Sequence, residues 1–137
     1  MFRFLEELWR NNRREWFEAN RARYERDVRD PMLAFIADFA PRLKKISPKF
    51  VADPRPSGAS MFRVYGDVRF SPDKSPYKTH VAARFSHVMG RDVPAPGFYV
   101  HLEPGGVFFA AGIWHPATLG RIRDLIAKHP ALWKRAI

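Results

Sequence analysis

Cysteine is absent from this chain of 137 residues. Its absence excludes thiol catalysis, thiolate metal sites and disulfides. The first ten residues, from Met1 to Arg10, contain no uninterrupted apolar stretch, so neither a secretory signal nor a membrane span is expected there. Gly105 and Gly106 precede a predicted strand and not a helix, so they do not form a phosphate loop. A cytoplasmic protein without a cofactor is expected.

Acidic residues are few relative to basic ones, and the formal net charge is +10. A strongly basic small protein invites an interpretation as a nucleic-acid-binding module. The surplus of positive charge is spread along the chain, at +4 in residues 1–50, +3 in 51–100 and +3 in 101–137. Because no block of like charge occurs, the distribution weakens the nucleic-acid interpretation, and general solubility is the simpler explanation of the charge.

Residues 1–50 have the apolar spacing of helices. Asn12 with Glu15 three residues later suggests a helix N-cap, and Asp30–Pro31 suggests the start of another helix. The strongest stripe recurs at steps of three and four residues: Met32, Ile36, Phe39, Leu43 and Ile46. Residues 117–137 have a similar amphipathic pattern and are also expected to be helical.

Residues 61–113 alternate between apolar and polar side chains, as half-buried antiparallel strands do. Glu103–Gly106 has the proline and glycine of a tight hairpin turn. We therefore predict one α+β domain over residues 1–137, with N-terminal helices packed on one face of a mainly antiparallel sheet.

Strand parity divides the predicted sheet into two faces. The residues expected to face the helices are Phe62, Val64, Val81, Phe85, Phe98, Val100 and Leu102. The residues expected on the open face are Arg63, Tyr65, His80, Arg84, Tyr99, His101 and Glu103. The hairpin should pair Leu102 with Val107, His101 with Phe108, Tyr99 with Ala110 and Gly97 with Gly112. Small residues beside this polar and aromatic surface leave room for a ligand.

The segment from Arg63 to His80 is dense in charge and contains two prolines, which stiffen it. Planar guanidinium groups and ammonium groups suit carboxylate or phosphate. The predicted anion site consists of Arg63, Arg69, Lys74, Tyr77, Lys78 and His80. In the alternative interpretation the charges form a structural network, with Asp67 paired to Arg69 or Arg63 and Asp73 paired to Lys74 or Lys78.

His101 and Glu103 lie two residues apart on a predicted strand and therefore share a face. They are the candidates for proton transfer, although a single strand histidine is more often an ordinary hydrogen-bonding residue. Together with His80 and His115 they have residue types that can bind metals, but no recognised ligand spacing is present. We predict no metal site.

Three functions are compatible with these residues. The leading one is binding of a small anionic or phosphorylated ligand on the open face, with or without its chemical processing. The second is a non-catalytic nucleic-acid-binding module that stacks bases on Tyr65 and Tyr99. The third is an interaction or scaffold domain without a ligand.

Three segments resemble a family of uncharacterised conserved proteins, a domain of unknown function. They run from Leu8 to Asn20, from Asp67 to Lys78, and from Pro96 to Pro116 with a short interruption. The resemblance implies a signature matched at Arg63, Asp67, Arg69, Phe70, Asp73, Lys74 and Tyr77. Gly66 stands where the family usually has arginine, which removes one cation from the predicted site.

Members of that family usually continue beyond the point where this chain stops. The resemblance therefore implies a shortened chain. Its last residues, Leu132–Ile137, lie within an amphipathic segment. We expect apolar surface near Leu132 and Trp133 to favour self-association.

Overall fold

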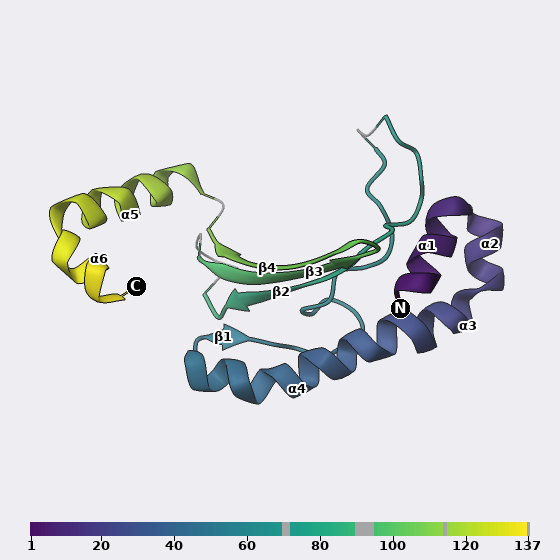
Figure 1. Ribbon diagram of the computed structural model, residues 1–137, viewed down its shortest axis with the longest axis horizontal. Helices are drawn as coiled ribbons and strands as arrows, with labels where there is room; N and C mark the ends of the chain where they lie inside the picture. The colour runs from purple at the N-terminus through teal and green to yellow at the C-terminus, as the bar shows by residue number, and fades with distance from the viewer. Residues whose placement is uncertain (70–71, 90–94, 114, 137) are drawn as a thin grey trace.

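The computed structural model describes residues 1–69, 72–89, 95–113 and 115–136. Helices come first, a four-stranded sheet follows, and two further helices end the chain. Helix α4 runs along one side of the sheet, and the last two helices extend away from the N-terminal helices (Figure 1). The predicted α+β class is confirmed. Within the described residues, no helix combines the length and apolar character needed to cross a membrane.

The N-terminal helices are α1 (Phe2–Arg10), α2 (Arg14–Ala19), α3 (Arg21–Tyr24) and α4 (Asp30–Ile46). A π-helical turn, η1 (Glu25–Arg29), joins α3 directly to α4. The predicted helix start at Asp30 is therefore not a separate capped start, because helical backbone leads into it from Arg29. Helix α4 also continues through Pro41.

Asn12 does not cap α2, contrary to the prediction from sequence. The cap position is Arg13, and no side chain bonds to the free backbone groups there. The Asn12 side chain instead contacts the backbone of Tyr77 twice. Its Nδ2 donates to the Tyr77 carbonyl at 2.8 Å, and its Oδ1 accepts from the Tyr77 amide at 3.1 Å. The asparagine thus joins the first helices to the charged segment 65 residues further on.

The sheet has the order β1-β2-β3-β4 and is antiparallel throughout. Its strands are β1 (Phe50–Val51), β2 (Val81–His87), β3 (Gly97–Glu103) and β4 (Gly106–Gly112). All four predicted hairpin pairs are confirmed: Leu102 with Val107, His101 with Phe108, Tyr99 with Ala110 and Gly97 with Gly112. Gly105 adopts a positive φ of 92°, as the predicted turn requires.

The predicted strand beginning at residue 61 is wrong. The sheet begins earlier, at Phe50, and residues 61–69 make only isolated bridges at Met61 and Tyr65. A loop separates β1 from residues 60–62, which return to the same edge of β2. There the Arg84 amide donates to Ser60 at 2.8 Å, and the Phe62 amide donates to Ala82 at 3.0 Å. Since Met61 pairs with Ala83 and is buried, its neighbour Phe62 lies on the open face and not against the helices.

The core lies between the N-terminal helices and one face of β2 and β3. It contains Phe4, Leu8, Phe17, Val28 and Ile36 from the helices, with Val81, Ala83, Phe85 and Val100 from the strands. Phe98, Leu102 and Val64 pack against it. Apart from Phe62, the residues predicted to face the helices therefore do so. The opposite face of the sheet is left for the site.

Two helices follow β4, α5 (Pro116–Lys128) and α6 (Pro130–Ala136), in agreement with the helical prediction for residues 117–137. Neither has a buried side chain among its described residues. Leu132 is 62% exposed and Trp133 is 45% exposed, as expected for this segment. Self-association through these residues stays a prediction.

Candidate functional site on the open face

The register of the strands arranges the open face in three rows across the sheet. The first contains Phe62, Ala82, His101 and Phe108, in order from the β2 edge to β4. The second contains Ser60, Arg84, Tyr99 and Ala110. The third contains Val51, Ser86, Gly97 and Gly112. One end of this face is therefore aromatic, the other consists of small residues, and Arg84 lies between them.

The aromatic end is a set of touching rings, which we call the aromatic cluster: Phe62, His80, Tyr99, His101 and Phe108. His80, His101 and Phe108 form a stack, with centroids 4.4 Å apart in the first pair and 4.8 Å in the second. Phe62 meets Tyr99 edge-on at 6.0 Å. Phe108 remains 49% exposed although one side of its ring is covered by His101.

His101 has a polar neighbour on each side along β3, a hydrogen-bonded hydroxyl and a nearby carboxylate. The Tyr99 hydroxyl lies 2.9 Å from its Nδ1, and the Glu103 carboxylate lies 3.4 Å from its Nε2. The predicted proximity of His101 and Glu103 is thus confirmed, and Tyr99 joins them as a third member. Partial burial, followed by the charge of Glu103, raises the pKa of Tyr99, so this hydroxyl stays protonated at neutral pH.

His80 is half-buried beside this chain of groups. Burial is the main cause that lowers its pKa, and the neighbouring His101 and Lys78 add to the effect, while Glu103 opposes it. At neutral pH the His80 imidazole is therefore uncharged. It stacks on His101 as a neutral ring and does not act as a cation for a ligand.

Arg84 is exposed and lies over the glycine floor of the open face. A Cβ built on Gly97 would meet the Arg84 Nε at 3.4 Å and Nη2 at 3.9 Å. The guanidinium therefore lies directly above the Gly97 backbone, within van der Waals reach of that position. Across the next strand, a Cβ on Gly112 would meet no atom within 4 Å. Among the described residues, the Arg84 guanidinium makes no hydrogen bond and no ion pair.

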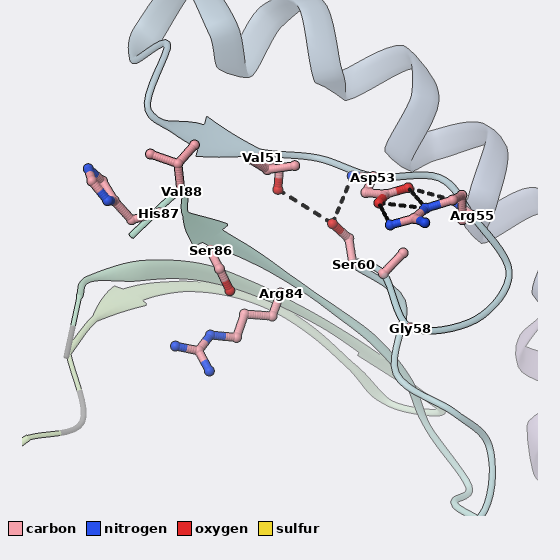
Figure 2. A pocket seen from close by; sticks show the side chains of 10 residues that line it. Val51, Asp53, Arg55, Gly58, Ser60, Arg84, Ser86, His87 and Val88 are labelled. Atoms are coloured by element: carbon pink, nitrogen blue, oxygen red, sulfur yellow. Dashed lines mark hydrogen bonds and ion pairs between the residues drawn. The ribbon is translucent and has the colours of Figure 1, made fainter. Parts of the chain in front are cut away.

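A cavity of about 480 Å³ borders Arg84 at the β1 end of the sheet. Figure 2 shows Arg84 and Ser86 projecting from β2, away from the pair formed by Asp53 and Arg55. That pair is held at 2.6 Å, and Ser60 Oγ fixes the loop by accepting from the Asp53 amide at 2.9 Å. Of the two arginines at the cavity, Arg55 is therefore already neutralised and Arg84 is available to a ligand.

Most of the predicted anion-site cations have protein partners. Arg69 binds Asp67 through two nitrogens, at 2.7 and 2.9 Å, as the structural-network alternative proposed. Lys74 donates to the Val68 carbonyl at 2.9 Å, and Lys78 donates to the Arg63 carbonyl at 3.2 Å. Arg69, Lys74 and Lys78 thus hold the loop of this segment together.

Asp73 pairs with neither Lys74 nor Lys78, contrary to the alternative prediction. Its carboxylate accepts from the Ser75 amide at 2.8 Å and closes a local turn. A second cavity, of about 380 Å³, is lined by Asp67 and Asp73 as well as by Lys78 and His80. The two carboxylates make this cavity a poor place for an anion.

Tyr77 was predicted on the rim of the site and lies in the core instead. It is 5% exposed and stacks on Phe17 with the ring centroids 4.0 Å apart. Burial is the first cause that raises its pKa. The aromatic ring is the signal in the sequence that points to the core, because a tyrosine buries a large apolar area even when a charged residue follows it.

Of the predicted set, His80 belongs to the aromatic cluster and Lys78 lies beside it. The Lys78 Nζ lies 5.6 Å from the Phe62 centroid. Burial and the charge of Arg63 lower the pKa of Lys78. The residue that sequence reasoning left out of the set is Arg84. Strand parity placed Arg84 on the predicted open face, whereas the anion site was predicted within the charged segment 63–80.

No group of three or more histidine and carboxylate side chains in the described ranges is arranged to hold a metal ion. His101 and Glu103 lie 3.4 Å apart, and the third nearby residue, His80, is stacked on the His101 ring. An imidazole between a hydroxyl and a carboxylate is a group that can exchange a proton.

A family model described as "Conserved hypothetical protein (DUF2461)" matches residues 1–137. The chain belongs to this family. The match confirms the resemblance stated from the sequence. No curated protein and no solved structure matches the chain. The DUF2461 description assigns no activity, so the function must be inferred from the residues.

One residue of the family signature, Phe70, lies outside the described residues. At Gly66, where the resemblance implied arginine, the backbone approaches a neighbouring segment closely. A Cβ there would lie 3.3 Å from the Ser75 carbonyl oxygen, and the Gly66 amide donates to Pro76 at 2.9 Å. Glycine at this position of the DUF2461 chain therefore allows two parts of the charged segment to lie against each other.

Proposed function

We propose that this protein binds a small anionic or phosphorylated molecule on the open face of its sheet. The observation that carries the proposal is the Arg84 guanidinium, which lies over Gly97 without a partner among the described residues. Arginine presents several donors in a plane and binds carboxylate or phosphate through two of them. The small residues around it leave space for such a group.

The proposal gives the first role to Arg84 and not to the cations of residues 63–78. Arg69 and Lys74 already bind protein oxygens, so a ligand would have to displace those contacts. Lys78, at the edge of the aromatic cluster, is the second cation that supports the proposal. Arg63 is exposed beside Lys78 and adds to the positive potential near this edge.

Processing of the ligand would use the Tyr99–His101–Glu103 chain. A histidine held between a hydroxyl and a carboxylate can accept a proton at one nitrogen while the carboxylate stabilises the resulting charge. His101 is the residue we assign to that role, with Glu103 orienting it. The proposal keeps the expected cytoplasmic location.

Calorimetric titration of the full chain with inorganic phosphate and pyrophosphate tests the proposal. We expect Arg84→Met to weaken binding at least tenfold, because the substitution keeps the apolar stem and removes the charge. Arg42→Met is the matched control, since Arg42 is exposed on α4 and lies away from the open face. Equal affinity of the two variants, or absence of binding to the wild type, would overturn the proposal.

A further inference from the structure

The open face provides a second kind of contact beside its cation. Phe108 is stacked on His101 on one side and is 49% exposed, so an uncovered part of its ring is available to a ligand. Exposed aromatic rings on antiparallel sheets stack the flat rings of nucleobases, because every base presents a π-face. A small inorganic anion has no flat ring that could stack on this surface.

The spacing between the ring and the cation suits one compact molecule. Arg84 on β2 and Phe108 on β4 are separated by a single strand and stand one row apart along the strands. With about 4.8 Å between adjacent strands and about 3.4 Å per residue, their backbone positions lie on the order of 12 Å apart. The guanidinium lies toward β3, over Gly97 in the third row, so the ligand has to extend from the first row toward the third. The floor between the ring and the guanidinium consists of Tyr99, Ala110, Gly97 and Gly112. Ala110, Gly97 and Gly112 are the small residues of this floor, and they leave room above the sheet for a sugar ring.

We propose that the ligand is a mononucleotide whose base stacks on Phe108 and whose phosphate binds Arg84. This inference rests on the proposed function, because it assigns the phosphate to the same arginine. It adds the chemical class of the rest of the ligand. A base and a phosphate on one sugar match the aromatic end of the open face and the Arg84 guanidinium over Gly97.

Charge favours a mononucleotide over a longer strand. Of the open-face positions in the three rows, only Arg84 carries a permanent positive charge. Lys78 stands at the edge of the aromatic cluster. A strand-binding groove needs cations that follow the backbone over several nucleotides.

The test compares two ligands and two adjacent phenylalanines. Ribose 5-phosphate and adenosine 5′-monophosphate are titrated into wild type, Phe108→Leu and Phe109→Leu. Phe109 is the matched control because it is the next residue of β4, 55% exposed, and lies on the other face. We expect the nucleotide to bind more tightly than the sugar phosphate, and Phe108→Leu to remove that advantage, a loss of roughly 5- to 100-fold.

The outcomes separate this inference from the proposed function. If both ligands bind equally and Phe108→Leu changes neither, a phosphate site is present and the nucleotide assignment is wrong. If the wild type binds neither ligand, the proposed function itself is wrong. Tight, strongly salt-dependent binding of a single-stranded oligonucleotide, with weak binding of the monophosphate, would also overturn the inference and favour a nucleic-acid-binding module. A Phe109→Leu variant that loses the nucleotide equally would show that the effect is structural.

Discussion

The N-terminal helices and the C-terminal helices have similar apolar spacing but opposite environments. Leu8 and Phe17 of the first group are 0% exposed, whereas Leu125 of α5 is 58% exposed and Leu132 of α6 is 62% exposed. The first group packs on β2 and β3 through Val81, Phe85 and Val100. The second group projects away from the sheet (Figure 1).

The difference shows that an amphipathic pattern specifies a helix but not the surface that covers it. Spacing by three and four residues places apolar side chains on one side of a helix, whatever that side meets. Burial needs a second apolar surface within reach. Strand β4 has an apolar surface on the face turned toward α4, where Val107 and Phe109 are 63% and 55% exposed, but α5 does not lie on it.

The largest expected difference between the two regions comes from one substitution made in each. Leu8→Ala removes a fully buried side chain and should lower the free energy of unfolding by about 2–5 kcal/mol, since it leaves a cavity. Leu125→Ala removes an exposed side chain and should change it by less than about 0.5 kcal/mol. Urea unfolding followed by circular dichroism measures both. Similar losses in the two variants would show that α5 packs on the rest of the protein.

A smaller effect is expected from protonation of His80, at the boundary between the packed half and the open face. Its folded pKa lies below the ordinary value near 6.5, chiefly because of burial. The unfolded chain therefore binds a proton more readily. The contribution of the neutral His80 to the free energy of unfolding should be fully present above pH 6.5. It should decrease as the pH falls from there toward the folded pKa. His101, Lys78 and Glu103 are the charged or titratable neighbours involved.

The His80→Gln variant should flatten this dependence when urea unfolding is measured at pH 7.5, 6.5 and 5.5. Gln keeps polar hydrogen-bonding atoms and cannot take up the proton. The matched control is His129→Gln, in the exposed segment between α5 and α6, which should keep the slope of the wild type. A slope that His80→Gln leaves unchanged would mean that another group causes the loss of stability in acid.

The sheet was predictable from the sequence because its alternation and turn are local signals. Gly105 specifies the hairpin turn, and parity then determines which side chains share a face with His101. The charged segment was not predictable in the same way. Whether Arg69 binds Asp67 or a ligand depends on side-chain geometry, which spacing does not determine.

Asn12 illustrates a further limit. Its spacing to Glu15 is that of a capping box, a local motif, but its amide is used by the backbone of Tyr77. A contact between residues 65 positions apart produces no periodic pattern in a single sequence. The same holds for Arg84, whose guanidinium lies over Gly97 of the neighbouring strand. The residues of the open face could be predicted from strand parity. Selecting Arg84 among them for the proposed site required the positions of the side chains.

The smallest expected effect on stability, and the sharpest test of the exposed region, comes from Trp133. Trp133→Ser should leave the urea midpoint unchanged at micromolar concentration, because the side chain has no core contacts to lose. Sedimentation velocity should instead show weaker self-association of the variant at high concentration, since exposed apolar surface favours contact between copies. Ile46→Ser is the matched control, because Ile46 is 70% exposed but belongs to α4. If wild type stays monomeric at every concentration, or if Ile46→Ser has the same effect, the C-terminal helices are not the contact surface and their exposure has no bearing on assembly.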